Sequence, residues 1–251
     1  MNAIWSEAKV KASHRLAMHL RVDRFRLANQ TPMVSFTFDD VPKSAATAGA
    51  RILEEHDARG TFYISGGLVG TTASPNWAAV DAQDIIALHR NGHEIGCHTF
   101  SHKRACDLNA GSLAEEIEHN QRYLRSLDPS IKVENFAYPF GYGSFVRKHQ
   151  LRTAFQSCRS IMPGVNSGAV DLQFLRALPL IDRCIDRDGI ERAFDEAQTN
   201  NGWLIFYSHD VADMPSPYGC SPALMNHALE AASRRQIPVL NMAEALLCAG
   251  A

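Results

Sequence analysis

The chain of 251 residues lacks paired cysteines, long apolar runs and a strong net charge. Its six cysteines include no CxxC pair and no tight framework, so we expect reduced thiols rather than a disulfide-stapled secreted domain. The N-terminus has charged and polar residues every few positions, which predicts neither a signal peptide nor a transmembrane segment and indicates a cytoplasmic protein. A formal net charge of −2 gives no reason to expect nucleic acid as a partner.

Hydrophobic and charged residues make up 45% and 21% of the chain, as in an ordinary globular protein, and the length suits one barrel of alternating strands and helices. Residues 1–30 stand apart because they hold six basic residues against two acidic ones. We predict a basic helical segment over residues 1–30 and a barrel domain over residues 31–251. The basic segment either contacts an anionic surface, such as that of a membrane, or is a solvated helix face packed on the barrel. The pattern specifies no oligomeric state.

Short β-branched and aromatic runs alternate with helical patterns along the rest of the chain, which is typical of a parallel sheet. Expected strands lie at residues 34–38, 61–64, 94–97, 133–138, 157–161, 175–181, 203–207 and 238–240. Expected helices lie at residues 44–58, 82–90, from 112 onward, 144–155, 189–199 and 221–235, before a terminal helical turn. Ser112 and Glu115 have the spacing of a capping box. About seven strand–helix units predict an α/β barrel, whose active site forms at the C-terminal ends of the strands.

Adjacent carboxylates, Asp39 and Asp40, follow the first of these strands. Side chains of neighbouring residues at a strand end point in different directions, so one carboxylate could bind a metal while the other acts as a base. The alternative is a turn or helix-capping pair ahead of Pro42.

Two histidines, His98 and His102, follow the strand at residues 94–97. Both imidazoles can reach one ion if the chain enters a helical turn there, because residues four apart then face the same way. Together with a carboxylate, for which Glu94 on the same strand is available, they would form a facial set for Zn²⁺ or a similar divalent metal. Cys97 adjoins the first histidine but should point to the opposite side of the strand, so we do not count it as a ligand.

Two more strand ends carry residues suited to catalysis. In Phe136-Ala-Tyr-Pro-Phe-Gly141 the proline and glycine break the strand and turn backbone amides outward, where an amide could stabilise an oxyanion. A plain strand-to-turn transition is the alternative. His209 follows the strand at residues 203–207 and could act as a general acid or base, because imidazole titrates near neutral pH. A structural histidine bonded to a neighbouring loop is the alternative.

In order and spacing, these motifs resemble those of the polysaccharide deacetylase family (NodB-like carbohydrate esterases) over about residues 33–240. The resemblance implies a distorted (β/α)7 barrel with Asp39 as catalytic base, His209 as catalytic acid and the backbone amide of Phe140 in an oxyanion hole. It also implies a divalent metal ion, with Zn²⁺ expected first and Co²⁺, Ni²⁺ or Mn²⁺ as alternatives. The metal ligands that the resemblance assigns are Asp40, His98 and His102.

The chain departs from the family pattern at three points. Val41 replaces a glycine between the carboxylates and Pro42, which alters the turn. Ala137 replaces the arginine that often steadies the catalytic aspartate, and we expect Arg176, on a later strand, to supply the charge instead. No aspartate is clearly marked to orient the catalytic histidine, and Asp182 and Asp186 are the candidates.

The resemblance predicts a metal-dependent hydrolase that removes N-acetyl groups from an amino sugar and releases acetate. Two alternatives stay open: the same site hydrolysing a non-sugar amide, such as a ureide or formyl amide, and a non-catalytic relative that only binds carbohydrate. Aromatic residues near the mouth of the barrel could stack on sugar rings or could be ordinary rim packing. These residues are Trp77, Tyr142 and Tyr218.

Overall fold

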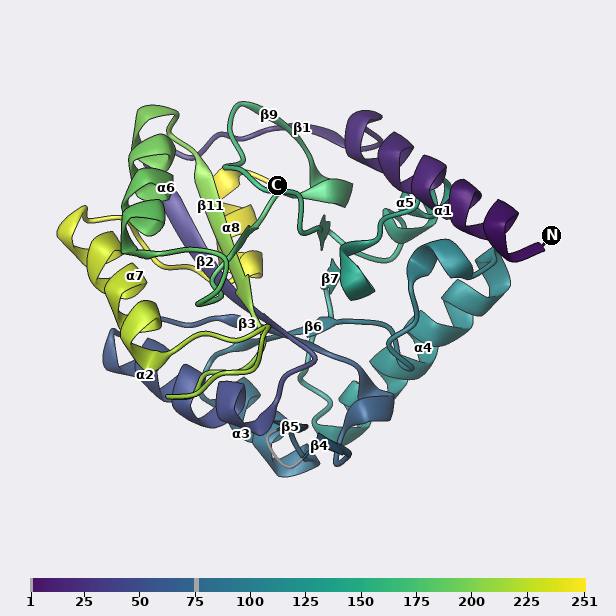
Figure 1. Cartoon of the computed structure of the whole chain (residues 1–251), viewed down its shortest axis with the longest axis horizontal. Helices are drawn as coiled ribbons and strands as arrows, with labels where there is room; N and C mark the ends of the chain where they lie inside the picture. The colour runs from purple at the N-terminus through teal and green to yellow at the C-terminus, as the bar shows by residue number, and fades with distance from the viewer. Residues whose placement is uncertain (1, 75–76) are drawn as a thin grey trace.

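A curled sheet of seven parallel strands forms the centre of the molecule, in the order β10-β11-β2-β3-β6-β7-β8 (Figure 1). The computed structural model describes the backbone of residues 2–74 and 77–251, and the side chains of residues 10–72 and 77–251. An isolated bridge between Arg159 and Leu175 brings the two edges of the sheet toward each other. The predicted (β/α)7 barrel is therefore confirmed, in an incompletely closed form. In sheet order the strands are β10 (Leu178–Pro179), β11 (Trp203–Ser208), β2 (Met33–Asp39), β3 (Thr61–Ile64), β6 (Glu94–Cys97), β7 (Asn135–Ala137) and β8 (Ser157–Arg159).

Strands β2 and β11 form the longest pairing of the sheet, from Met33 opposite Trp203 to Phe38 opposite Ser208. Every residue of β2 is buried, as expected for a parallel strand covered on both faces. Alternate residues divide between two clusters: Phe36 and Phe38 pack in the layer under the helices, whereas Met33 and Trp203 pack inside the barrel. The buried strand ends directly at the polar residues Asp39 and Asp40.

In the residues that the structure describes, seven helices follow α1, and six of them cover the outside of the sheet while the last closes the start of the barrel (Figure 1). The closing helix, α8, donates the backbone N–H of Met242 to Thr61 and that of Ala243 to Glu94, at the first residues of β3 and β6. The polar network there seals the end of the barrel opposite the predicted site. The helices are α2 (Ala50–Glu55), α3 (Ala82–Arg90), α4 (Ala110–Leu127), α5 (Phe145–Leu151), α6 (Arg187–Thr199), α7 (Pro222–Arg234) and α8 (Met242–Ala249).

Several boundaries differ from those expected, and the strands β7, β8 and β10 are shorter than predicted. The cap of α4 is Asn109, whose side chain accepts the backbone N–H of Ser112, so the predicted capping box at Ser112 is wrong. Asparagine is as strong a cap as serine, and beginning earlier extends the helix. The helix expected at 44–58 is a π-helical turn, Ala45–Gly49, followed by α2, and the strand expected at 238–240 is a single bridge to β2.

The basic segment begins with a helix, α1 (Asn2–His19), and continues into strand β1 (Arg24–Arg26), which pairs with β9 (Ala169–Asp171). Buried Lys148 donates to the carbonyls of Ala17 and Leu20 at the end of α1 and forms an ion pair of 2.5 Å with Asp171. The segment is thus fastened to the barrel by buried polar contacts. The helix of this segment ends at His19, and the division of the chain into a segment over residues 1–30 and a barrel domain stays a prediction.

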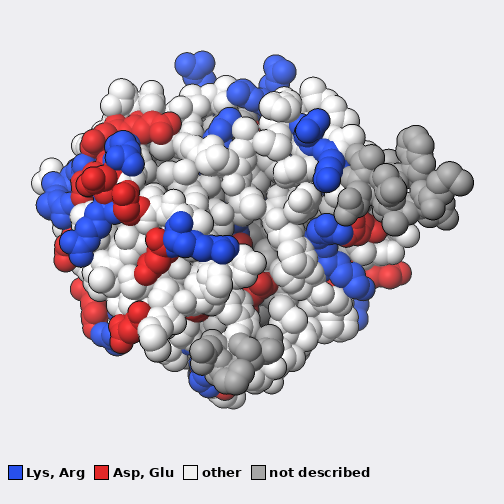
Figure 2. Space-filling view, viewed as in Figure 1, with Lys and Arg blue, Asp and Glu red and all other residues white. Residues whose placement is uncertain are grey.

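Charged side chains on the face seen in Figure 2 lie mainly around the rim, and the centre is mostly uncharged. Lys and Arg side chains gather over the edge that β1 and β9 occupy in Figure 1, where Arg24 and Arg26 are exposed. Among the described residues, no helix has the length and apolar character needed to cross a membrane.

Candidate active site

Five residues with left-handed backbone mark the C-terminal ends of β2, β6 and β7. Their φ angles lie between 41° and 58°, a region that non-glycine residues rarely adopt. Such strain persists where the surrounding structure enforces it, and it concentrates at functional sites. The three strand ends therefore form one strained rim around the mouth of the barrel. The five residues are Asp40, Val41, Thr99, His102 and Phe140.

Asp40, His98 and His102 form the one cluster of possible metal ligands found in the described part of the chain, with ligand atoms within 4.8 Å of one another. Oδ1 of Asp40 lies 3.1 Å from Nε2 of His102 and 3.6 Å from Nε2 of His98. This oxygen is buried and has no hydrogen-bond donor in the described structure. Burial raises the pKa of Asp40 to about 6, opposed by His209 and reinforced by Asp39. A divalent cation would satisfy this carboxylate, so the residues fit a metal.

The imidazole of His98 is oriented for metal binding by a bond on its far side. Nδ1 lies 2.9 Å from the carbonyl oxygen of Ala137, and because a carbonyl only accepts, Nδ1 must carry the proton. The lone pair of Nε2 then faces Asp40, the arrangement typical of a metal-bound histidine. Burial lowers the pKa of His98 to about 3, so this ring is neutral at physiological pH.

Asp39 lies behind this cluster, buried, and its Oδ1 accepts a hydrogen bond from Nη2 of Arg159. The guanidinium of Arg159 is itself fully buried, between the rings of Tyr63 and Tyr207, whose centroids lie 5.2 and 5.3 Å away. Burial tends to raise the pKa of Asp39, but the charge of Arg159, with smaller effects of His98 and His209, holds it below its ordinary value. Asp39 is therefore an ionised carboxylate beside the cluster.

The expectation that Arg176 supports Asp39 is wrong. Nη1 of Arg176 donates instead to the carbonyl of Pro163, 2.8 Å away, and the residue does not line the cavity at the end of the barrel. Arg159 lies in β8 directly opposite Ala137 in β7, so the charge missing at that position is supplied one strand further along the sheet. The arginine within the strand expected at residues 157–161 was the available sequence signal.

His209 completes the site from the end of β11, with Nε2 4.0 Å from Oδ2 of Asp40. Its Nδ1 donates to the carbonyl of Tyr218, 3.2 Å away, so a backbone group orients the ring. Neither of the two aspartates predicted to orient His209 does so. Asp182 accepts from Ser221, and Asp186 caps α6.

The aspartate that supports His209 is its neighbour, Asp210, acting through the loop that holds Tyr218. The buried carboxylate of Asp210 accepts the backbone N–H of Ser216 at 2.7 Å and the hydroxyl of the same residue at 2.5 Å. Gly219 lies against it so closely that an added Cβ would be 2.3 Å from the carboxylate. Sequence reasoning overlooked this role because it depends on how the loop folds back.

Phe140 lies in a tight turn, Pro139–Gly141; the residue is 57% exposed, and its ring centroid is 4.4 Å from that of His102. Gly141 also has positive φ, and a Cβ there would lie 2.2 Å from Ile161, so this position requires glycine. Following the turn, Tyr142 contacts His14 of α1 with 5.0 Å between ring centroids. The turn places Phe140 beside the cluster of possible metal ligands, and the role of its backbone amide stays a prediction.

A cavity of about 770 Å³ joins these residues at the mouth of the barrel. Trp77, Tyr142 and Tyr218 line it, as expected for aromatic residues near the mouth, and their stacking on sugars stays a prediction. Glu94 does not: it lies at the other end of β6, and Asp40 instead provides the carboxylate beside the two histidines. Cys97 is buried beside Asn120, outside this cavity, in accord with its exclusion as a ligand.

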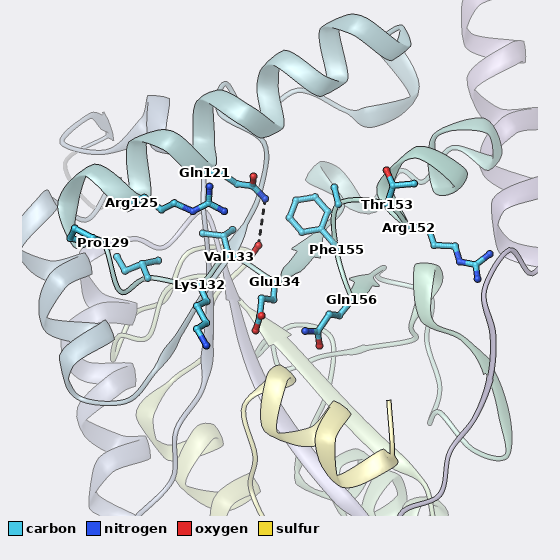
Figure 3. Close-up of a pocket in the computed structure, with 12 residues that line it drawn as sticks. Gln121, Arg125, Pro129, Lys132, Val133, Glu134, Arg152, Thr153, Phe155 and Gln156 are labelled. Atoms are coloured by element: carbon cyan, nitrogen blue, oxygen red, sulfur yellow. Dashed lines mark hydrogen bonds between the residues drawn. The ribbon is translucent and has the colours of Figure 1, made fainter.

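A second hollow, of about 760 Å³, lies where the chain enters β7 and β8, at the opposite end of these strands (Figure 3). Two of its polar side chains have partners: Gln121 donates to the carbonyl of Val133, which also lines the hollow, and Arg152 pairs with Asp23. The cluster of possible metal ligands lies outside it. The two hollows are therefore similar in volume, but the cluster of possible metal ligands lies in the one at the mouth of the barrel.

A family model described as polysaccharide deacetylase matches residues 27–155, which are 129 of the 251 residues. A barrel of this kind with Asp, His and His at its mouth defines the class, and the chain belongs to the polysaccharide deacetylase family. The predicted resemblance is confirmed.

Two curated relatives are similar over part of their length. The chain is 24% identical over 180 residues to the bifunctional xylanase/deacetylase of Pseudobutyrivibrio xylanivorans, covering 62% of this chain and 29% of the relative. It is 27% identical over 103 residues to the chitin deacetylase of Colletotrichum lindemuthianum, covering 39% of this chain and 38% of the relative. In both, the match spans less than half of the relative.

Solved structures match over most of the chain. The chitin deacetylase from Colletotrichum lindemuthianum superposes with a TM-score of 0.64 at 16% identity, covering 88% of this chain and 89% of that one. A family 4 acetyl xylan esterase from Clostridium thermocellum, in complex with a cobalt ion, has a TM-score of 0.57 at 19% identity, covering 86% and 90%. At such identities the likeness establishes the fold.

Proposed function

We propose that this protein is a metal-dependent deacetylase that removes the N-acetyl group from an amino sugar of a saccharide and releases acetate. The observation that carries the proposal is the juxtaposition of an ionised carboxylate, Asp39, with the Asp40, His98 and His102 cluster. Family membership supports it, as do the deacetylase names of the relatives.

The metal would be held by Asp40, His98 and His102, with Zn²⁺ expected first and Co²⁺, Ni²⁺ or Mn²⁺ as alternatives. Two imidazoles and one carboxylate suit Zn²⁺ and leave positions for water and substrate. The cobalt ion in the esterase of similar fold is consistent with such a site. The chemistry that a bound divalent ion supplies is polarisation of the acetyl carbonyl and a lowered pKa of water.

Proton transfer is divided between Asp39 and His209. Asp39, kept ionised by Arg159, accepts the proton of the water that attacks the acetyl carbon. As the carbonyl oxygen gains charge, the backbone N–H of Phe140 donates to it. His209, with Nδ1 fixed on the Tyr218 carbonyl, gives a proton from Nε2 to the departing nitrogen when the carbon–nitrogen bond breaks. The products are acetate and a free amino sugar.

Acetate release from N-acetylated oligosaccharides by metal-stripped protein, before and after Zn²⁺, Co²⁺, Ni²⁺ or Mn²⁺ is added, tests the proposal. We expect acetate only after a metal is added. Hydrolysis of a ureide or formyl amide without acetate release would favour the non-sugar alternative. A protein that binds oligosaccharides but neither retains metal nor releases acetate would be the non-catalytic relative.

A further inference from the structure

Three arginine side chains, those of Arg104, Arg159 and Arg183, lie over tyrosine rings that line the active-site cavity, and the first two are paired with a carboxylate. The guanidinium of Arg104 lies 5.5 Å from the ring centroid of Tyr142, and its Nε forms an ion pair of 2.6 Å with Asp107. The guanidinium of Arg183 lies 4.9 Å from the ring centroid of Tyr218. In the described part of the chain, Arg183 has neither a salt bridge nor a side-chain hydrogen bond.

The turn that contains Arg183 is fixed beside the cavity by hydrogen bonds of the neighbouring residue. Arg183 lies in the exposed turn that follows β10, at the same end of the barrel as the metal cluster, and it lines the cavity itself. The neighbouring Asp182 ties this turn to the loop of Tyr218 through its N–H to the Gly219 carbonyl, 3.2 Å, and its carboxylate to the Ser221 N–H, 2.8 Å. The stacked, planar guanidinium is therefore placed at the rim with its donors available.

In the part of the chain that the structure describes, no carboxylate in the cavity is paired with Arg183. The only carboxylates that line the cavity among the described residues are Asp39 and Asp40. Asp39 is paired with Arg159, and Asp40 faces the two histidines of the cluster. Neither carboxylate forms an ion pair with Arg183, so its charge is locally unpaired, and a divalent ion on Asp40 would make the potential of the cavity positive. Clefts with one sign of charge concentrate ligands of the other sign.

We propose that Arg183 binds an anionic group, a carboxylate or a phosphate, carried by the saccharide whose N-acetyl group enters the site. This inference rests on the proposed deacetylase function and narrows its substrate class to acidic N-acetylated saccharides. A guanidinium binds either group with two parallel charge-assisted hydrogen bonds. Arg183 is then a specificity-determining residue rather than a catalytic one.

The test compares three sugars that share one N-acetylated ring: neutral N-acetylglucosamine, its 6-phosphate, and N-acetylmuramic acid, which bears a carboxylate. The ratio of kcat/KM for each acidic sugar to that for the neutral one is measured for the wild type, Arg183→Gln and Arg183→Lys. The matched control is Arg104→Gln, which removes an arginine stacked on the opposite tyrosine. The phosphate and carboxylate arms identify which anion is preferred.

We expect the wild type to favour at least one acidic sugar, and Arg183→Gln to reduce that ratio about tenfold, mainly through KM, as loss of a charge-assisted hydrogen bond predicts. Arg183→Lys should retain part of the preference. Added salt should shrink the ratio in the wild type. Equal ratios in the wild type and Arg183→Gln, or an equal fall in Arg104→Gln, would overturn the inference.

Binding of the same sugars, followed by NMR titration, separates this inference from the proposed function. Tighter binding of an acidic sugar that depends on Arg183, without acetate release from any sugar, would leave the inference standing and refute the deacetylase. Acetate release with the same acidic-to-neutral ratio of kcat/KM in the wild type and Arg183→Gln would support the deacetylase and refute the inference.

Discussion

Two buried carboxylates, one at each end of the barrel, differ in how their oxygens are satisfied. Glu94, at the start of β6, accepts hydrogen bonds from Thr61 at 2.9 Å, from Asn135 at 2.6 Å and from the backbone N–H of Ala243 at 2.9 Å. Asp40, after the end of β2, has a buried oxygen with no donor in the described structure. Burial raises the pKa of both carboxyl groups.

The difference separates structure from function. A buried polar group with all its partners specifies and rigidifies a fold, whereas one without them needs a reason beyond stability. The residues with positive φ angles also fall into a structural and a functional group. Of the positive-φ residues that are not glycine, Asp57, Asn201 and Gln236 lie just after helices, where such a turn is common. The other five include Asp40 itself and lie at the strand ends around it.

The largest expected effect comes from removing the partner of Asp39. Arg159→Met should lower kcat/KM by at least about 100-fold, because the pKa of the buried Asp39 then rises and less of it is an ionised carboxylate that can accept a proton. It should also lower the free energy of unfolding by about 3 kcal/mol, because the buried Asp39 loses its partner. Arg176→Met, the arginine that the sequence favoured, should change kcat/KM by less than about twofold. Similar losses in the two variants would refute the assignment.

The loop behind His209 should matter next. Asp210→Ala frees the backbone of Ser216 and with it the Tyr218 carbonyl that orients His209. We expect kcat to fall about tenfold with metal content unchanged, because a general acid that is poorly positioned loses part of its contribution. Ser216→Ala keeps the backbone bond and should lose less. Metal loss in Asp210→Ala would show that the loop supports the cluster instead.

The two carboxylates should respond oppositely to removal of charge. Glu94→Gln places an amide donor where at least one bond must be accepted, and should lower the free energy of unfolding by about 1–3 kcal/mol. Asp40→Asn should leave the metal-free protein unchanged or raise that free energy by up to about 1 kcal/mol, because it removes a buried charge beside Asp39. Chemical denaturation of both variants without metal decides this. If Asp40→Asn lowered the free energy of unfolding as much as Glu94→Gln, the proposed difference between the two carboxylates would be wrong.

The smallest expected effect lies near Glu94, at His93. This buried ring accepts the N–H of Gly60 on Nδ1 and contacts Glu54 through Nε2, and burial lowers its pKa below 6.5. A lowered folded-state pKa means that its contribution is complete above about pH 6.5 and is lost as the pH falls, by up to about 1.4 kcal/mol per pH unit.

Unfolding free energies measured between pH 7 and 5 should therefore fall less steeply in His93→Gln than in the wild type. The exposed histidine variant His149→Gln should follow the wild type and is the control. A slope in His93→Gln equal to that of the wild type would contradict the assignment.

Much of the fold could be predicted from sequence because the strands are near-continuous apolar runs between capped helices, as at residues 61–64 and 82–90. The short antiparallel pairs, β1 with β9 and β4 (Thr72–Ser74) with β5 (Trp77–Ala78), could not, because each depends on a partner strand rather than on its own pattern.

The site divides in the same way. Asp39, Asp40, His98 and His102 are adjacent or closely spaced after strands, so sequence spacing reveals them, and the structure brings them together. Arg159 is placed by the register of β8 against β7, which a sequence does not display, so sequence alone points to Arg176 instead.

Metal content and acetate release, measured together on the wild type, Asp39→Asn and Asp40→Ala, test the central claim most directly. We expect about one ion per chain in the wild type and in Asp39→Asn, and none in Asp40→Ala, because only the last variant loses a ligand. Acetate should be released by the wild type alone. Full activity of Asp39→Asn, or an Asp40→Ala protein that keeps its ion, would contradict the division of roles between the two adjacent carboxylates.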